Sequence, residues 1–176
     1  MAYISNEKDS TTGAAKTITY PHHEIHDGSS FVISDVQNLD TTTAYWMITT
    51  PDSTKYSHVI FDVTCTGEFT LTITEGADRT GTTALTAINR RRIGTPTAAT
   101  LVMHRGYSGG TTNGATTIFT MRDGATGVSG KTISGGGARG MNEFILKPNT
   151  KYIIAVTTYA DSWVSGHLDW YEHTDR

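Results

Sequence analysis

Cysteine is almost absent from this chain, and its scarcity limits the possible architectures. The 176 residues include a single cysteine, Cys65, so no disulfide can form within the chain. Cys65 lies in the apolar run HVIFDVTCTG, where we expect a buried, unpaired thiol and not a reactive one. A disulfide scaffold is therefore excluded, and a chain of this length can bury a substantial hydrophobic core instead.

Excess positive charge and long apolar runs are missing as well. The formal net charge is -3, so the chain has no overall positive field to attract nucleic acid, and we expect no nucleic-acid partner. No apolar run approaches the roughly 18 residues of a membrane span, and the opening MAYISNEKDSTTGAAK has no apolar core of a signal peptide. We expect no membrane association, and a protein made in a cytoplasm.

Helical periodicity is also missing, whereas strand periodicity is clear. In GEFTLTITEG, the apolar Phe69, Leu71 and Ile73 alternate with polar residues, as in a strand with one buried face. Further β-rich runs are SSFVISDV, TAYWMITT, SHVIFDVTC, ALTAINRRR, TLVMH, TTIFTM, EFILK, KYIIAVTTY and SGHLDWYEH. Because these runs are many, short and separated by turn residues, we predict an all-β, jelly-roll-like antiparallel β-sandwich with almost no helix.

The domain organisation predicted from composition is simple. Residues 1–20 are polar and poor in large apolar side chains, so we expect an N-terminal arm that cannot bury itself alone and orders against a neighbour. Residues 21–176 are expected to form the single sandwich domain. Near its end, LKPNTKY combines Pro148 and Asn149 between two apolar runs, which predicts a hairpin.

A glycine-rich region contains the one stretch that resembles a nucleotide-binding loop. Most of the 18 glycines lie between Gly106 and Gly140, which predicts long surface loops around a strand. Within this region, ATGVSGKT at 125–132 matches a loose P-loop pattern. A P-loop holds phosphate at the start of a helix, yet ISGGGARG follows Lys131 and Thr132. We therefore predict a loop, with Lys131 solvated or meeting a neighbouring chain.

Other patterns with chemical potential are weak. PHHEIHDG places His22, Glu24 and His26 on one side of an extended chain, a set that could bind Zn²⁺. It lacks a fourth ligand, so a polar strand edge is the favoured interpretation. No nucleophile elbow, His-Glu-x-x-His or zinc-deaminase signature occurs. We expect no catalytic, cofactor-binding or metal-binding residues, and no enzyme.

Basic residues are the candidates for contacts between chains. On a strand, Arg90 and Arg92 of AINRRRIG would project from one face and Arg91 from the other. Such arginines are suited to bidentate salt bridges with carboxylates, either within the fold or across a subunit boundary. Together with Lys131 and Arg139 in the glycine-rich region, they form the predicted interface with other chains.

Several segments resemble a known family. HDGSSF, GTTALTAINRRR, FILKPNTKYIIAVTT and the closing LDWYEH resemble segments of the small head-decoration, or cement, proteins of tailed bacteriophages. The resemblance runs from about His22 to His173, apart from the glycine-rich stretch. It implies a jelly-roll-like β-sandwich whose copies bind the outside of the icosahedral shell, often as trimers, and bridge major capsid subunits.

One segment departs from the pattern of the family it resembles. Relatives often alternate Asn and Arg in the region of Asn89, Arg90 and Arg92, and here Arg91 and Ile93 break that alternation. The resemblance still implies a homotrimer on the capsid exterior, with the major capsid protein and further copies of the chain as its partners.

The alternative interpretation is a receptor-binding or glycan-binding module of a phage tail or fibre. Tyr45, Trp46, Tyr107 and Trp163 could each stack on a sugar ring. Tyr45 and Trp46 lie in an apolar run and are expected in the core. Trp163, in the polar stretch YADSWVSG, is the better candidate for exposure.

Overall fold

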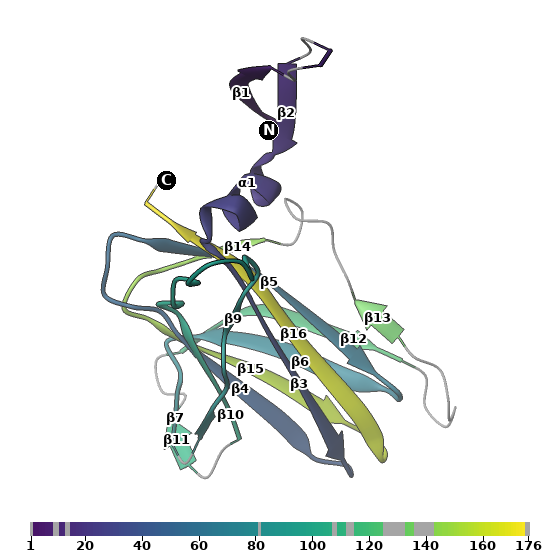
Figure 1. Ribbon diagram of the computed structural model, residues 1–176. Helices are drawn as coiled ribbons and strands as arrows, with labels where there is room; N and C mark the ends of the chain where they lie inside the picture. Colours follow the sequence, from purple (N-terminus) through teal and green to yellow (C-terminus); the bar gives the residue numbers. More distant parts are fainter. Residues whose placement is uncertain are drawn as a thin grey trace.

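The chain folds into two facing antiparallel sheets (Figure 1). The computed structural model describes residues 2–8, 11–12, 15–80, 82–106, 109–111, 115–124, 133–135 and 143–174. Within these ranges, the first sheet has the order β12 (Thr116–Asp123), β6 (Phe69–Glu75), β15 (Lys151–Thr158), β4 (Thr43–Thr49), β10 (Val102–Arg105), β8 (Thr83–Ala84). The second sheet has the order β13 (Ile133–Gly135), β5 (Tyr56–Cys65), β16 (Ser162–His173), β3 (Ser30–Leu39), β9 (Ile88–Asn89), with β14 (Phe144–Leu146) also paired to β5.

The strand order confirms the jelly-roll prediction. Strands β3, β4, β5 and β6 alternate between the second and the first sheet, and β13, β15 and β16 alternate again on the way back. The result sets β13-β5-β16-β3 against β12-β6-β15-β4, the interleaved order that two Greek keys give in a jelly roll. The chain is therefore an all-β antiparallel sandwich, as its alternating patterns predict.

The N-terminal segment lies outside the sandwich. β1 (Ala2–Lys8) and β2 (Ala15–Thr19) pair with each other in an antiparallel hairpin. Figure 1 shows this hairpin beyond one end of the sandwich, joined to it by α1 (Tyr20–Asp27). We call this the α1 end. A further two-stranded sheet is formed by β7 (Asp78–Thr80) and β11 (Gly109–Thr111).

The core lies between the sheets and follows the predicted alternation. Phe69, Leu71 and Ile73 of β6 are all buried, which confirms the period-two interpretation of GEFTLTITEG. They pack in one cluster with residues from the second sheet, including Trp170. Cys65 belongs to this cluster as a buried free thiol, as expected.

Trp46 lies in the centre of the core, where a buried carboxylate binds its indole N–H and a glycine leaves room for its ring. Its side chain is fully buried, and its indole N–H donates to Asp35 Oδ2 of the facing sheet at 2.9 Å. Asp35 is itself buried and accepts a second hydrogen bond from Arg105 at 2.9 Å. Opposite the indole stands Gly166, where a Cβ would lie only 2.9 Å from Trp46 Cζ2. The ring therefore fits because residue 166 has no side chain.

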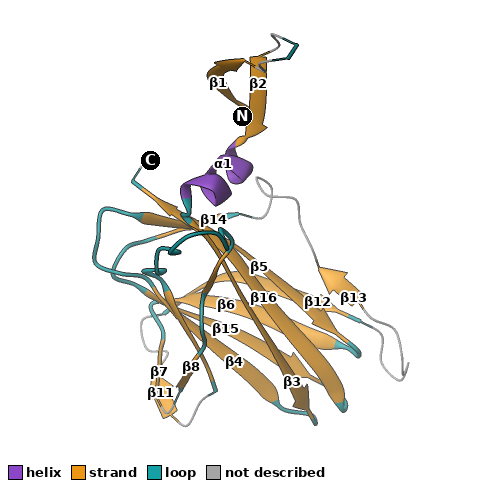
Figure 2. Ribbon diagram, viewed as in Figure 1, coloured by secondary structure: helices purple, strands orange, loops and turns teal. Residues whose placement is uncertain are grey.

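The near absence of helix holds for the described residues of the sandwich but not for the segment that leads into it. The residues of PHHEIHDG form α1, not an extended strand edge (Figure 2). Pro21 suits the first turn of a helix because its ring fixes φ. Gly28, at φ +82°, ends it: the Gly28 N–H donates to Ile25 O at 3.2 Å and the Ser29 N–H to Glu24 O at 3.0 Å, a Schellman cap.

The predicted hairpin at LKPNTKY is wrong, although the turn itself is present. A turn occupies residues 148–149, and Asn149 has the left-handed φ of +49° that its side chain tolerates. The strands on either side do not pair with each other, because β14 bonds to β5 and β15 bonds to β4 and β6. The turn carries the chain from one sheet to the other.

Candidate functional site

Three distant segments meet at the α1 end, where Asn89 joins two of them. The side chain of Asn89 is buried, and its Nδ2 donates to Gly28 O at 2.7 Å and to Thr97 O at 2.9 Å. Its Oδ1 accepts from the Arg91 N–H at 2.8 Å. Asn89 thus holds the exit of α1 against the loop that follows β9.

Glu172 brings the third segment, the end of β16, into the same place. Its buried carboxylate accepts hydrogen bonds from Thr100 N at 3.0 Å, Thr100 Oγ1 at 2.6 Å, Leu101 N at 2.9 Å and Trp170 Nε1 at 3.0 Å. A carboxylate that accepts this many hydrogen bonds is stable when buried. Glu172 therefore fixes the loop before β10 and has little capacity left for acid or base chemistry.

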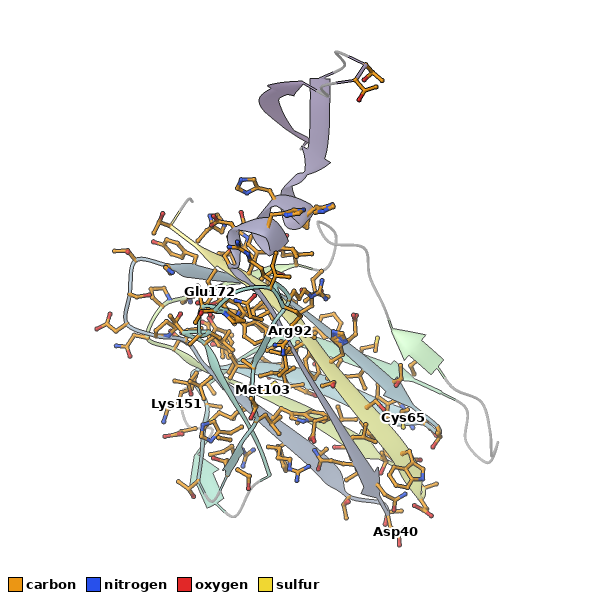
Figure 3. All side chains as sticks on the ribbon, viewed as in Figure 1. Asp40, Cys65, Arg92, Met103, Lys151 and Glu172 are labelled. Carbon is orange, nitrogen blue, oxygen red and sulfur yellow. The ribbon has the colours of Figure 1, made fainter. Side chains whose placement is uncertain are left out.

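Glu24 and Ser29 complete the link between the helix and the sheet. Glu24 is buried, and its carboxylate accepts a hydrogen bond from the Ser29 hydroxyl. The Ser29 carbonyl in turn accepts from the Glu172 N–H at 3.0 Å. We call Glu24, Ser29, Asn89 and Glu172 the helix seat, since together they connect α1, the β9 loop and β16. Figure 3 labels Glu172 toward the α1 end and Asp40 at the opposite end.

A cavity of about 310 Å³ adjoins the helix seat. Its lining includes Asp27, Lys55, Thr97 and His173, together with Ser29 and Glu172 of the seat. The Ser29 hydroxyl and the Glu172 carboxylate are already engaged in hydrogen bonds, as described above. The cavity therefore offers a polar binding surface of mixed charge more readily than a reactive group.

The three arginines do not lie along a strand as predicted. β9 ends at Asn89, so Arg90, Arg91 and Arg92 follow it in a loop. The side chain of Arg90 forms a salt bridge with Asp169 on β16, consistent with a bridge within the fold. Arg91 and Arg92 are exposed, and no carboxylate in the described ranges forms a salt bridge with either side chain.

The remaining basic candidates and the P-loop-like stretch lie outside the described residues. This applies to Lys131, to Arg139 and to the whole of 125–132. The next described element after that stretch is β13, which begins at Ile133. A strand at this position, where a P-loop requires a helix, supports the interpretation of the pattern as coincidence.

The helix α1 separates Glu24 from His22 and His26, the three residues that could bind Zn²⁺ if the chain were extended. His22 and His26 lie together on the exposed face of α1, with 2.9 Å between their Nε2 atoms, whereas Glu24 is buried in the helix seat. Within the described part of the chain, no group of three or more His, Cys, Asp or Glu side chains could hold a metal ion. The prediction of an extended strand edge at these residues is wrong, because Tyr20–Asp27 form a helix.

A second group of histidines was not anticipated from the sequence. His58 and Tyr171 are buried neighbours on β5 and β16, with parallel rings 4.6 Å apart and 3.1 Å between Tyr171 Oη and His58 Nδ1. His173 Nε2 lies 2.9 Å from His58 Nε2. The closing WYEH segment therefore serves both the helix seat and this ring stack. The alternation of Trp170 and Glu172 with Tyr171 and His173 along β16 is the sequence feature that could have indicated this group.

Two of the aromatic candidates for sugar stacking, Trp46 and Trp163, lie as expected, whereas Tyr45, expected in the core, packs against the small cluster of Met47, Ala77 and Ile153. Trp46 is buried, and Tyr45 is half-buried beneath Arg79, whose guanidinium lies 4.5 Å from the ring centroid. Trp163 is 58% exposed, as is Val36 at 54%. In the β16–β3 register Trp163 lies opposite Asn38 and Val36 opposite Ser165, so the two exposed side chains lie diagonally on the outer face of the second sheet. Tyr107 lies outside the described residues.

Comparison with known proteins does not identify the chain. No family model matches it, and no curated protein and no solved structure is significantly similar to it. Among the described residues, no helix is long and apolar enough to cross a membrane. The geometry of the described residues therefore carries the functional argument.

In a cluster around the first sheet, the pKa values of Glu75 and Tyr152 are shifted. Tyr152 Oη donates to Glu75 Oε2 at 3.0 Å, and Lys147 Nζ donates to Glu75 Oε1 at 2.6 Å. The Lys147 hydrogen bond lowers the pKa of Glu75, and burial raises the pKa of Tyr152 to about 12. The cluster fixes the turn between β14 and β15, because the Lys147 N–H also donates to Tyr152 Oη at 2.9 Å.

Proposed function

We propose that this chain is a structural protein of a tailed-bacteriophage head, which binds the outer surface of the capsid as a homotrimer and stabilises it. The observation that carries the proposal is the helix seat, with the β1–β2 hairpin beyond it (Figure 1). Three of the segments that resemble decoration proteins, HDGSSF, GTTALTAINRRR and LDWYEH, supply all of the seat except Glu24. The resemblance therefore falls on residues that hold the arm in place.

The proposed role needs a rigid body and a projecting element, not a reactive site. A buried network fixes α1 to the sandwich, so the hairpin leaves the body in a defined direction where a neighbouring subunit can meet it. A partner that binds only the assembled shell stabilises it by its own binding free energy at every copy. We therefore assign the chain a binding role and not an enzymatic one.

The exposed arginines are the proposed side-chain contacts. Arg90 is used within the fold, by its salt bridge to Asp169. Arg91 and Arg92 are exposed in the loop after β9 and remain available to carboxylates of a capsid subunit or of a second copy. Lys131 and Arg139 lie outside the described residues, so their proposed contacts are based on the sequence alone. A trimer that contacts several capsid subunits at once also gains from multivalency.

The arm provides the experiment. Removal of residues 1–19 leaves the sandwich and the helix seat in place, so the truncated chain is expected to fold. We expect it to lose binding to mature heads, whereas the full chain sediments as a trimer and binds them. A double Arg91→Ala, Arg92→Ala variant tests the side-chain contacts separately. A full chain that is a stable monomer and leaves mature heads unbound would remove the proposal.

A second candidate function rests on Trp163. Its 58% exposure leaves an indole ring of the kind on which sugar rings stack, as expected of a receptor-binding module. A glycan array separates the two functions. Glycan binding that is lost in Trp163→Ala, together with no affinity for heads, would favour this alternative.

A further inference from the structure

Two histidines on the exposed face of α1 form a hydrogen-bonded pair. His22 and His26 are four residues apart on the helix and therefore project from the same face one turn apart. Their rings are nearly parallel, at an interplanar angle of 9° with centroids 4.8 Å apart, and their Nε2 atoms are 2.9 Å apart. Both side chains are exposed, so their nitrogen atoms are accessible from solvent.

The pair is separate from the helix seat. Glu24, which lies between the two histidines in the sequence, is buried on the opposite side of the helix, where its carboxylate bonds to Ser29. His23 lies near that carboxylate, with 3.7 Å between its Nδ1 and Glu24 Oε1. An ion can therefore bind to the exposed pair without disturbing the contacts that hold α1 on the sandwich.

We propose that His22 and His26 form a bidentate site for a divalent transition-metal ion, with a preference for Cu²⁺. Two imidazoles on consecutive turns of a helix are an established arrangement for metal binding. The two Nε2 atoms share a hydrogen bond at 2.9 Å, and a metal ion would displace the proton that lies between them. Imidazole nitrogens suit Cu²⁺, Ni²⁺ and Zn²⁺.

Copper is favoured over nickel and zinc by the general order of stability for nitrogen ligands. Because the two rings are nearly parallel, each exposed ring must rotate before both lone pairs meet at one ion, and water completes the coordination. Once one imidazole has bound, the second binds intramolecularly, which raises the affinity above that of a single histidine. The ion would also bridge one turn of an eight-residue helix, which is too short to be stable alone.

This inference does not rest on the proposed capsid role, because it concerns only the ligands on α1. The experiment is isothermal titration of the untagged full chain with CuCl₂, NiCl₂ and ZnCl₂. We expect one Cu²⁺ per chain, bound more tightly than Ni²⁺ or Zn²⁺, and an electron paramagnetic resonance spectrum with coupling to two nitrogens. His22→Gln and His26→Gln should each weaken Cu²⁺ binding about tenfold or more, since each removes the chelate.

His23→Gln is the matched control, since it removes a histidine of the same helix that lies outside the pair. Its Cu²⁺ affinity should equal that of the unaltered chain. Because both members of the pair are exposed, the variants are expected to fold, and circular dichroism checks this. The inference is overturned if the chain binds no Cu²⁺ at about 100 μM, a concentration well above the dissociation constant expected of a chelate. Equal Cu²⁺ binding by the double His22→Gln, His26→Gln variant would overturn it as well.

Discussion

The side-chain amide of Asn89 donates a 2.7 Å hydrogen bond to the carbonyl oxygen of Gly28, a residue 61 positions earlier in the chain. Gly28 is the residue that ends α1, and its left-handed φ of +82° turns the chain into β3. The bond therefore joins the one helix of the described ranges to the short strand β9. Through it, the position of the N-terminal arm depends on a residue in the middle of the sequence.

Replacement of Asn89 with alanine should destabilise the protein. The change leaves the carbonyl groups of Gly28 and Thr97 without their donor in a buried site, at a cost of about 2–3 kcal/mol in the free energy of unfolding. Urea denaturation measures this cost. The control is Asn38→Ala, at an exposed position, which should change the free energy by less than about 0.5 kcal/mol. Equal midpoints for the two variants would show that the helix seat contributes little.

Replacement of Glu172 with glutamine tests the charge of the seat with almost no change in shape. Glutamine has one acceptor oxygen where the carboxylate has two, so its N–H₂ group must face donors in either orientation: those of Thr100, Leu101 and Trp170 at the Oε1 position, or the two of Thr100 at the Oε2 position. We expect a loss of about 2–4 kcal/mol in the free energy of unfolding. Faster amide hydrogen exchange at Thr100 and Leu101 should accompany it. Asp40→Asn, at an exposed position, is the neutral control, and unchanged exchange in Glu172→Gln would contradict the assigned role.

Gly166→Ala should disturb the core at one ring. The new Cβ would lie 2.9 Å from Trp46 Cζ2 and 3.1 Å from Cη2, and the indole cannot easily move because Asp35 holds its N–H. Such overpacking costs about 1–3 kcal/mol. Thermal denaturation and the near-ultraviolet circular dichroism of tryptophan measure the effect. Ser165→Ala, at the adjacent position on the outer face, should leave both signals unchanged, and a fully stable Gly166→Ala protein would refute the close packing.

Alkaline pH should weaken the fold through Tyr152. Its pKa is raised to about 12 in the folded protein, whereas an unfolded tyrosine ionises near 10. Its contribution to stability is therefore complete below about pH 10 and is lost as the pH rises toward 12, by roughly 2 kcal/mol. Tyr152→Phe should flatten the dependence in this window, and Tyr56→Phe should retain it. A dependence that persists unchanged in Tyr152→Phe would assign it to other groups.

Much of the sandwich could be predicted because one-sided burial imposes a period of two on a strand. The alternation of Phe69, Leu71 and Ile73 required no knowledge of the neighbouring strands. The helix was missed because α1 has only eight residues and is held by packing, so apolar periodicity is a poor guide to it. The sequence features that indicate this helix lie at its ends: Pro21 in the first turn and Gly28 directly after the last residue.

The helix seat could not be predicted, since its contacts join residues remote in the sequence. Asn89 and Glu172 contact Gly28 and Leu101 at separations of 61 and 71 residues, and no local pattern encodes such pairs. The hairpin predicted at Pro148 failed for a related reason. Turn residues determine that the chain reverses, but which strand lies beside β14 is decided by the packing of two sheets.

Quantitative mass spectrometry of purified virions tests the proposed function most directly. In purified tailed-phage particles whose genome carries the gene, the copies of this chain are counted against those of the major capsid protein. We predict a fixed ratio, with the chain released as trimers from the outside of otherwise intact heads. Absence of the chain from virions, or its presence only in tail fibres, would contradict the proposed role as a capsid-stabilising protein.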